Sequence, residues 1–520
     1  MADSPAQPQD GAAPAGAGPW PFSTRTQLIA GFVMAFSNFM VLLDMTVANV
    51  SVPHIAGNLG ITLEQGTWVI TSYAVAEAIC VPLTGWLSDR FGVVRVYVAA
   101  MAAFGLFSLA CGLSPTLGLL VAARIGQGFA GAPLMPISQA MMIRVFPPER
   151  RAKAMGVWAM TVLVAPAMGP ILGGYISDSF SWHWIFLINV PIAIACSTVG
   201  AVVLRPAETE KIRKPIDRVG LALLVFWIGC LQIMLDIGRD RDWFADWRVA
   251  GLGIAAVIGL CVFVIWELTE EHPIVDIRIF RNRGYAMAVI MLSVCFSAYF
   301  ASIVVIPQWL QSTQGYTAQD AGMVTAWTGC MSFLAAMFLP KILEKVDLRI
   351  PVFLGVGWFA IQSLNRSRWT TGLDFWTLSE PQILQGFAMP LFIMPLTQMA
   401  MAAVKPGEVA SAAGIQNFTR TLAVAIATSL TLTDWSDEQR IKHAGFADTI
   451  RPAETMQTLA QSGMSTQQAR TIVDNLVNEQ AVTLAMTHTF LISAGAAVLA
   501  MGLVWFMPKV RSLARMDAAH

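Results

Sequence analysis

The chain has 520 residues, of which 56% are hydrophobic and only 13% are charged, whereas a soluble domain carries roughly 25% charged residues. A water-soluble fold of this composition would expose large apolar patches. The 33 Lys and Arg residues balance 33 Asp and Glu residues, so nothing indicates a nucleic-acid partner. The composition therefore predicts an integral membrane protein embedded in a lipid bilayer.

Residues 1–24 contain no Lys or Arg and so lack the charged start of a secretory signal. We interpret them as a disordered cytoplasmic tail. The rest of the chain holds apolar runs of about the length that a membrane helix requires, ~20 residues. They predict an all-α protein with fourteen spans, at about 27–53, 67–88, 93–113, 116–142, 153–177, 184–204, 217–237, 248–268, 285–310, 318–340, 350–365, 380–403, 409–432 and 484–507.

The basic residues predict how these spans are oriented. Loops on the side of the N-terminus carry 22 of the 33 Lys and Arg residues, whereas the opposite loops, which include Arg366, carry nine. Because basic residues are enriched in cytoplasmic loops, both termini are expected in the cytoplasm.

An internal repeat divides the chain. Gln127-Gly128-Phe129-Ala130 recurs as Gln385-Gly386-Phe387-Ala388, and each copy is followed by a similar Pro-containing segment. Transporters are commonly built from such duplicated halves, with the substrate site between them. The predicted parts are a six-helix half at 25–205, a linker with two extra helices at 206–283, a second six-helix half at 284–508 and a cytoplasmic tail at 509–520.

The residue types that hold metals or cofactors are scattered. The seven cysteines all fall in apolar runs without a CxxC pair, and the six histidines lack ligand spacing. We therefore expect no disulfide framework, no metal site and no cofactor.

A loop motif follows the second span. Gly85-Trp86-Leu87-Ser88-Asp89-Arg90-Phe91-Gly92 resembles the G-x-L-x-D-R-x-G loop of the major facilitator superfamily. The resemblance implies a conformational latch formed by Gly85, Asp89, Arg90 and Gly92, with Asp89 pairing with Arg90 or Arg95 or capping another helix. The alternative is a solvated charge cluster that only sets topology.

A second motif lies in the fifth span. Ala165-Pro166-Ala167-Met168-Gly169-Pro170-Ile171-Leu172-Gly173-Gly174 resembles the antiporter motif of the same superfamily, with Ala165 in place of its first Gly. Pro166 and Pro170 should kink the helix, and Gly169, Gly173 and Gly174 should let a neighbouring helix approach closely. The resemblance implies exchange rather than symport, and the alternative is a generic kinked helix.

Two further segments narrow the resemblance. Leu43-Asp44-Met45-Thr46-Val47-Ala48-Asn49-Val50 and the run from Trp182 to Pro191, which includes Asn189, are similar to signatures of the fourteen-helix drug:proton antiporters of the EmrB/QacA type, most closely the EmrB branch. This resemblance implies the major facilitator fold, with two six-helix pseudo-repeats plus two inserted helices. It covers nearly the whole chain from about residue 27.

Four ionisable residues lie inside predicted spans: Asp44, Glu77, Arg124 and Arg420. Charge at a span centre costs ~2.5–3.5 kcal/mol on insertion scales, so a functional role is the first expectation. Helical rise places Asp44, Glu77 and Arg124 at depths where they can share one aqueous pocket and couple protons to transport. The alternative is a structural ion pair. Family resemblance supports Asp44 and Arg124, while the role of Glu77 rests on position alone.

The substrate cavity is expected to include Asn49, Gln127, Asn417 and Arg420. For Arg420, the alternative is an ion pair or backbone contact that fixes span packing.

Residues 433–483 form the one long predicted loop, on the periplasmic side. Ser465-Thr466-Gln467-Gln468 resembles a capping box and predicts a helix through about Glu479. The resemblance implies a periplasmic membrane-fusion adaptor and a TolC-type outer-membrane channel as partners, and the loop is a candidate adaptor surface. It can equally be a lid or a solvated excursion.

The sequence as a whole predicts a proton-coupled multidrug efflux antiporter that exports amphipathic hydrophobic compounds by alternating access. A first alternative is export of one specific metabolite, siderophore or fatty acid on the same scaffold. A membrane enzyme or receptor is a second, but no nucleophile–base pair, metal cluster or phosphate-binding loop supports it.

Overall fold

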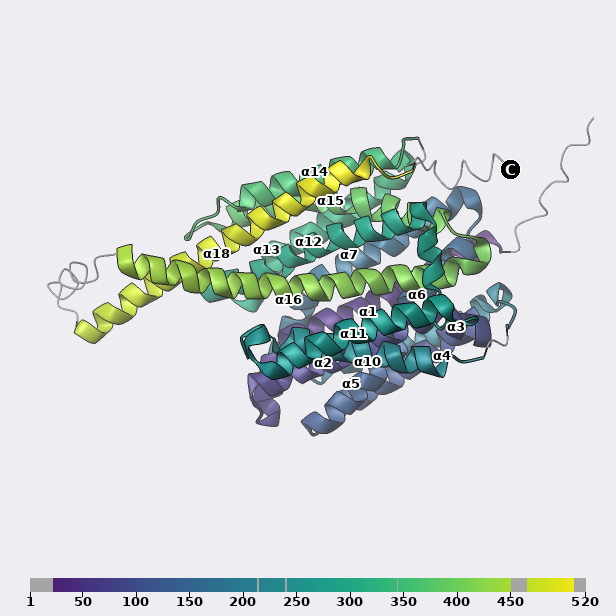
Figure 1. Cartoon of the computed structure of the whole chain (residues 1–520), viewed down its shortest axis with the longest axis horizontal. Coiled ribbons are helices and arrows are strands. Elements are labelled where there is room, and N and C mark those ends of the chain that lie inside the picture. Colours follow the sequence, from purple (N-terminus) through teal and green to yellow (C-terminus); the bar gives the residue numbers. More distant parts are fainter. Residues whose placement is uncertain (1–21, 213–214, 239–240, 344, 450–464, 509–520) are drawn as a thin grey trace, which may run out of the picture.

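The computed structural model describes residues 22–212, 215–238, 241–343, 345–449 and 465–508. Within these ranges the chain forms a bundle of helices that run along a common axis (Figure 1), and no strand occurs in them. The principal helices are α1 (Thr24–Leu59), α2 (Leu63–Cys80), α3 (Thr84–Phe91), α4 (Val93–Gly112), α5 (Leu117–Gly131), α6 (Leu134–Val145), α7 (Pro148–Ser179), α8 (Trp184–Leu187), α9 (Asn189–Val203), α10 (Arg218–Ile237), α11 (Trp247–Thr269), α12 (Arg283–Thr313), α13 (Ala318–Leu343), α14 (Arg349–Arg366), α15 (Phe375–Ala402), α16 (Val409–Thr449) and α18 (Thr466–Val504).

Local sequence explains where many of these helices begin and end. The side chains of Ser23, Thr62 and Thr116 each accept a hydrogen bond from a backbone N–H in the first turn of α1, α2 and α5, which satisfies a donor that the helix itself leaves free. Gly60, with φ of 64°, ends α1 in the left-handed conformation that glycine adopts without strain.

Several spans are interrupted. The second passes from α2 through the 3-10 turn η1 (Val81–Leu83) into α3, and the fourth consists of α5 and α6. Pro82 and Pro133 lie at these breaks, where a proline removes a backbone donor. The predicted kink in the fifth span is confirmed, because segments Pro148–Pro166 and Ile171–Ser179 of α7 meet at 48°.

Eleven helical stretches of the described chain are long and apolar enough to cross a membrane, or twelve if bent α7 counts as one span. The all-α membrane fold is thereby confirmed. The two remaining predicted spans fall in α14 and the first half of α16. Both pack among the other helices, but they are not counted among the helices that are long and apolar enough to cross a membrane. The number fourteen stays a prediction.

The helices before α10 and those after α11 pair in the same order. α1 packs on α7, α2 on α5 and α4 on α9, while α12 packs on α16, α13 on α15 and α14 on α18. We call α1 to α9 the first group and α12 to α18 the second group. The repeated pairing is what a duplication of six spans would produce.

The two groups meet along α7 with α13 and along α16 with α3 and α6. We call the end of the bundle where α3 meets α4, at Gly92, the inner end. The opposite end, where α1 meets α2 at Gly60, is the outer end. Near the inner end, a Cβ on Gly85 would lie only 2.9 Å from the Cα of Ser411. In this conformation the inner end is therefore closed between the groups.

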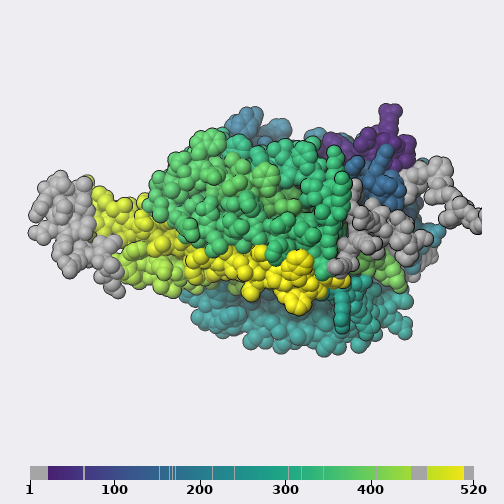
Figure 2. All heavy atoms as spheres, turned by 90° about the horizontal axis from the view of Figure 1, so that it is seen from above, coloured from purple at the N-terminus to yellow at the C-terminus, as the bar shows by residue number. Residues whose placement is uncertain are grey.

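The predicted loop 433–483 is wrong for the residues described within it. α16 continues without a break through Thr449, and α18 begins at Thr466 and continues through Val504. The two helices project together beyond the rest of the bundle at the left of Figure 1, and the yellow and light-green atoms of Figure 2 show the same projection. The predicted capping box is confirmed, since Ser465 and Gln468 cap α18 reciprocally, but the helix does not end near Glu479. Residues 450–464 lie outside the described residues.

Candidate functional site

A buried ion pair lies at the centre of the first group. Arg124 Nη1 on α5 is 2.7 Å from Asp44 Oδ2 on α1, and the side chains are 0% and 1% exposed. The second carboxylate oxygen, Oδ1, accepts hydrogen bonds from Gln127 Nε2 at 3.0 Å and Asn189 Nδ2 at 2.7 Å. The carboxylate therefore receives three donors, the satisfaction that a buried charge requires.

Arg124 is held on its other sides as well. Its Nε donates to the carbonyl of Val69 on α2 at 2.9 Å, and its guanidinium lies 4.2 Å from the centroid of the Tyr73 ring. A cation over an aromatic face is favourable. The pair thus joins α1, α2 and α5, and any change in its charge acts on the packing of all three helices.

Two members of this cluster were not among the site residues predicted from the sequence. Ser108 on α4 accepts from Gln127 Nε2 at 3.1 Å and from Asn189 Nδ2 at 3.2 Å, and it donates to the carbonyl of Phe186 at 2.9 Å. Asn189 is the first residue of α9. Asn189 could have been found, because it belongs to the signature run that ends at Pro191. Ser108 has no such sequence signal.

The predicted shared pocket is only partly correct. Asp44 and Arg124 come together, but they are sealed from solvent rather than placed in an aqueous pocket. Glu77, on α2, is half-buried and has no hydrogen bond or ion pair to another described residue. Its carboxylate lies close enough to Arg420 and Arg124 to interact with their charges. Glu77 is thus the more accessible of the two carboxyls and lies between the buried pair and the second group.

Arg420 and Asn417 on α16 reach across to the first group. Arg420 Nη2 lies 2.9 Å from Met135 Sδ on α6, and its guanidinium lies 4.8 Å from the Phe296 ring centroid. Asn417 Nδ2 donates to Gln139 Oε1 on α6 at 2.9 Å. The contacts with Met135 and Gln139 cross the boundary between the groups and contribute to its closure, whereas Phe296 belongs to α12 of the second group.

The expectation of one substrate cavity lined by Asn49, Gln127, Asn417 and Arg420 is not met. Asn49 is exposed on α1, Gln127 belongs to the Asp44 cluster, and Asn417 is 1% exposed. Gln127 and the amide nitrogen of Asn417 already form hydrogen bonds within the protein, whereas Asn417 Oδ1 is buried and has no hydrogen-bond partner among the described residues.

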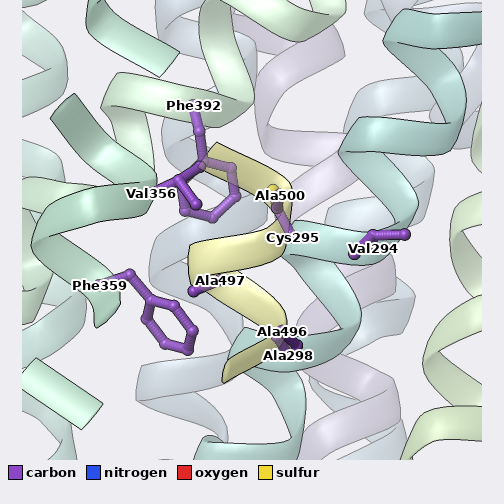
Figure 3. A pocket seen from close by; sticks show the side chains of 9 residues that line it. All are labelled: Val294, Cys295, Ala298, Val356, Phe359, Phe392, Ala496, Ala497 and Ala500. Atoms are coloured by element: carbon purple, nitrogen blue, oxygen red, sulfur yellow. The ribbon is translucent and has the colours of Figure 1, made fainter. Parts of the chain in front are cut away.

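Two hollows in the described chain involve none of these residues. Figure 3 shows the first, a void of about 10 Å³ within the second group, with an apolar lining of Val294, Cys295, Ala298, Val356, Phe359, Phe392, Ala496, Ala497 and Ala500. A void of that size holds no more than about one water molecule. The second, about 400 Å³, lies between α10 and α11 and is lined only by apolar residues and Gly253. Neither combines room with polar groups.

The predicted latch lies at the inner end. Gly85 allows α3 to contact α16, as described above, and Gly92 has φ of 92°, a conformation that favours glycine. The backbone carbonyl of Asp89 accepts from Ile212 N at 2.8 Å, and the Arg90 guanidinium lies 5.5 Å from the Trp86 ring centroid. Of the four latch residues, Gly85 therefore lies at a boundary between the groups, while the contacts described for Asp89, Arg90 and Gly92 lie within the first group or with residues 206–212. The latch role stays a prediction.

A carboxylate that the sequence analysis did not select lies beside the latch. Glu208 accepts from the backbone N–H groups of Val94 at 3.0 Å and Arg95 at 3.3 Å, and its Oε2 lies 3.9 Å from Arg95 Nε. A negative charge at a helix N-terminus is stabilising. Glu208 thus caps α4, and it also fills the space where a Gly92 side chain would begin.

The glycines of the α7 motif differ from one another. A Cβ on Gly169 would lie 2.0 Å from Thr46 Oγ1, and one on Gly173 would lie 3.0 Å from the carbonyl oxygen of Val47. Both permit the close packing of α7 on α1 near Asp44. No described atom lies within 4 Å of a Cβ built on Gly174, so the close contact predicted there is wrong.

The second group has its own buried guanidinium, which the sequence analysis placed in an external loop. Arg366 ends α14 and is fully buried. It bonds the side chains of Gln385 and Gln382 and the carbonyl of Pro381. Gln385 corresponds in the repeat to Gln127, but no described carboxylate forms a salt bridge with Arg366. The second group therefore repeats the polar cluster without its acid.

Comparisons with known proteins identify the family. The sequence profile described as "Major Facilitator Superfamily" matches residues 34–428. The chain is 41% identical over 492 residues to "Multidrug export protein EmrB" of Escherichia coli (strain K12), covering 94% of this chain and 96% of that protein. It is 39% identical over 472 residues to "Fatty acid resistance protein FarB" of Neisseria gonorrhoeae, covering 90% and 93%. The predicted resemblance to the EmrB type is confirmed.

A solved structure supports the fold. The human organic anion transporter MFSD10 (TETRAN) superposes with a TM-score of 0.59 at 14% identity, over 92% of this chain and 99% of that one. At that identity the likeness concerns the fold alone.

Proposed function

This chain belongs to the major facilitator superfamily, and we propose that it is a proton-coupled antiporter that exports amphipathic hydrophobic compounds. The observation that carries the proposal is the buried Asp44–Arg124 pair, set in a chain that is 41% identical over 94% of its length to a multidrug export protein. Intramembrane ionisable residues are costly and mark proton or substrate pathways by default. The chain is a multi-pass transporter, and we place it in a bacterial inner membrane with both termini in the cytoplasm.

Exchange would proceed by alternating access between the first and second groups. We propose that residues 25–205 and 284–508 act as the two moving halves. The structure holds the inner end closed through the contact of Gly85 with Ser411 and the hydrogen bond from Asn417 to Gln139. If the inner end faces the cytoplasm, this conformation corresponds to the stage at which substrate leaves on the far side.

Glu77 and the Asp44–Arg124 pair would carry the proton coupling. Protonation of Asp44 removes the negative charge that offsets Arg124, and Glu77 lies between that pair and Arg420 of the second group. A proton that reaches Glu77 therefore changes the attraction between the groups. Each proton that enters the cell gains about 2.3 kcal/mol per 100 mV of membrane potential, enough to bias such a step.

The test is transport in proteoliposomes. We expect Glu77→Gln and Asp44→Asn to abolish efflux driven by a pH gradient while drug binding stays measurable. Glu267→Gln is the matched control, because Glu267 is also a buried carboxyl in a spanning helix but accepts from backbone N–H groups, those of Val275 and Ile274. Unchanged gradient-driven efflux in both variants would refute the proton-coupling role.

A second candidate function is export of one specific compound. The similarity to a fatty acid resistance protein at 39% identity favours a fatty acid as that compound. A panel of hydrophobic cations, neutral drugs and fatty acids, applied to the same proteoliposomes, separates the two. Transport of only one class would replace the multidrug proposal, and flux without ATP would exclude an ATP-dependent pump.

We also propose that the projecting parts of α16 and α18 contact a periplasmic adaptor, which would connect the transporter to a TolC-type outer-membrane channel. The two helices remain paired along the projection, since Trp435 Nε1 donates to the Val482 carbonyl at 3.2 Å and Gln439 Nε2 to Asn478 Oδ1 at 2.9 Å. Ile441 and Leu476 are nevertheless 63% and 55% exposed there. These apolar side chains are available to a protein partner at the projection.

The adaptor contact is tested by co-purification with a periplasmic adaptor expressed alongside the transporter. Ile441→Gln with Leu476→Gln should reduce the amount of adaptor recovered, and the neighbouring exposed substitution Asn475→Gln should not. Equal recovery with all variants would assign the projection another role. The proteoliposome assay above does not depend on this outcome.

A further inference from the structure

The inserted helix α10 contacts both groups of helices. It packs against α2 of the first group and against α16 of the second. The ring of Trp227 on α10 lies 6.1 Å from that of Phe418 on α16 in an edge-to-face arrangement. Nearer the outer end, Met234 and Leu235 of α10 pack with Ala425 and Ile426 of α16. α10 is therefore part of the boundary between the groups and not only a lipid-facing addition.

Two consecutive residues in the last turn of α10 bond to opposite groups. Asp236 Oδ1 accepts from Thr71 Oγ1 on α2 at 2.8 Å, whereas the carbonyl of Leu235 accepts from Ser429 Oγ on α16 at 2.9 Å. The last carbonyls of a helix lack partners within the helix, and such groups are costly inside a membrane. Ser429 satisfies one of them, so the end of α10 depends on α16.

The backbone beyond α10 is held in an unusual conformation. Asp242 and Trp243 have φ of 50° and 53° and are the only non-glycine residues with positive φ in the described part of the chain. Positive φ is disfavoured for residues with a Cβ and persists only where surrounding contacts enforce it. Here Trp243 Nε1 donates to Thr433 Oγ1 on α16 at 3.0 Å. The strained turn thus directs the indole to the second group.

We infer that the outer end of α10 is a tie between the two groups, formed by Leu235, Asp236 and Trp243 with Thr71, Ser429 and Thr433. The inference rests on the proposed alternating access. Since α2 and α16 belong to groups that move against each other, a helix bonded to both must release one of them when the outer end closes. The tie therefore stabilises the present conformation. Through it, the inserted helices α10 and α11 set the relative populations of the two access states.

The experiment measures conformation rather than transport. Spin labels are placed at Gly57→Cys and Gln319→Cys, which are both exposed at the outer end. A Cβ on Gly57 meets nothing within 4 Å. The exposed Cys261 and Cys330 are replaced by Ala in the same chain. Electron paramagnetic resonance in lipid nanodiscs then gives the distribution of distances between the groups. A failure of drug transport would leave this readout intact.

Thr71→Val with Trp243→Phe removes one hydrogen bond to each group while it keeps most of the side-chain volume. We expect the share of molecules with a short outer-end distance to rise at least about threefold. Thr325→Val is the matched control, because that hydroxyl bonds only to carbonyls of its own helix. A distribution equal to that of the control would overturn the inference.

A covalent version covers the case in which the double variant does not fold. Thr71→Cys with Asp236→Cys, closed as a disulfide, is combined with Trp243→Cys and Thr433→Cys. The second pair is bridged by a short bis-methanethiosulfonate reagent, because the length of an indole separates the two Cα atoms beyond the reach of a direct disulfide. For this experiment the labels are attached to a keto amino acid at positions 57 and 319, because labels linked through cysteine would be lost to the reductant. Closing both bridges should freeze the labelled distance at its long value. Cleaving them with a reductant, which is removed before the measurement, should restore the spread of distances. If the bridged protein still samples the short distance, α10 does not tie the groups together.

Discussion

At the scale of single residues, the Asp44–Arg124 pair is costly to bury, and its charge state affects how several helices pack. Both side chains are almost fully buried, and a buried charge is tolerated only with a partner and additional hydrogen bonds. Gln127 and Asn189 supply those bonds to Asp44, and Ser108 accepts from both of them. The arrangement makes the charge state of one carboxyl decisive for the packing of several helices, as proton coupling through packing would require.

We expect Asp44→Asn to lower the free energy of unfolding by about 3–5 kcal/mol, since removal of one partner leaves a buried charge uncompensated. Arg124→Gln should have a similar effect. The double variant should be less destabilised than the sum of the two, because no charge is left unpaired. Thermal or denaturant unfolding in detergent measures the three values, and strictly additive losses would show that the two residues do not act as a pair.

Arg366 shows how much a residue's role depends on its surroundings. It has the same side chain as Arg124 and contacts Gln385, the repeat counterpart of Gln127. Its hydrogen-bond partners are neutral, so among the described residues no carboxylate paired with Arg366 can take up or release a proton. The asymmetry favours the first group as the place of proton coupling.

At the scale of the helix, α7 and α1 pack through residues without side chains. Gly169 and Gly173 place α7 directly against Thr46 and Val47, in the first turn that follows Asp44. The bend of 48° in α7 lies between Pro166 and Ile171. A shift of α7 along α1 would therefore change the packing around the buried ion pair.

Gly169→Ala should lower stability by about 1–3 kcal/mol, as overpacking in a close contact does, because the new Cβ would lie 2.0 Å from Thr46 Oγ1. Gly174→Ala, five residues further along the same helix, has open space and should leave the melting temperature unchanged. The two melting curves in detergent decide the matter. Equal behaviour of the two variants would show that α7 does not pack on α1 as described.

At the scale of the whole molecule, the two groups are joined at different places by different means. At the inner end the joint is close backbone packing of α3 on α16. Toward the outer end, α10 adds hydrogen bonds to both groups. A transporter that alternates access must break the first joint to open inward and rearrange the second.

Gly85→Ala should open the inner end, because its Cβ would come within 2.9 Å of the Ser411 backbone. Thr84 is fully buried and faces Gly414 of α16, so a cysteine placed at Thr84 reports this opening. Its alkylation by a membrane-impermeant reagent, supplied to both sides of the membrane, should become several-fold faster in Gly85→Ala. Gly407→Ala is the control and should leave the alkylation rate unchanged, because a Cβ there meets no atom within 4 Å. An unchanged rate in Gly85→Ala would show that the inner end is not closed at this contact.

The sequence by itself determined the membrane class, most spans and the family, because these follow from local composition and from motifs read along one stretch of chain. It also placed Asp44 and Arg124 at compatible depths, since helical rise converts residue number into distance. The sequence could not show that Arg366 is buried, or that α4 is capped by Glu208 rather than by Asp89, which is nearer in the chain. Both depend on which segments become neighbours in the fold.

Only the tertiary structure decided the remainder. α16 continues through Thr449 because polar residues of its outer part pair with α18, whereas hydropathy alone ends the span near 432. Burial in one cluster separated Gln127 from the predicted cavity, and the open space beside Gly174 distinguished it from Gly169. The physical reason is the same in each case. Helix formation is encoded within a few turns, but pairing, access to solvent and the use of a polar group depend on contacts between residues far apart in the chain.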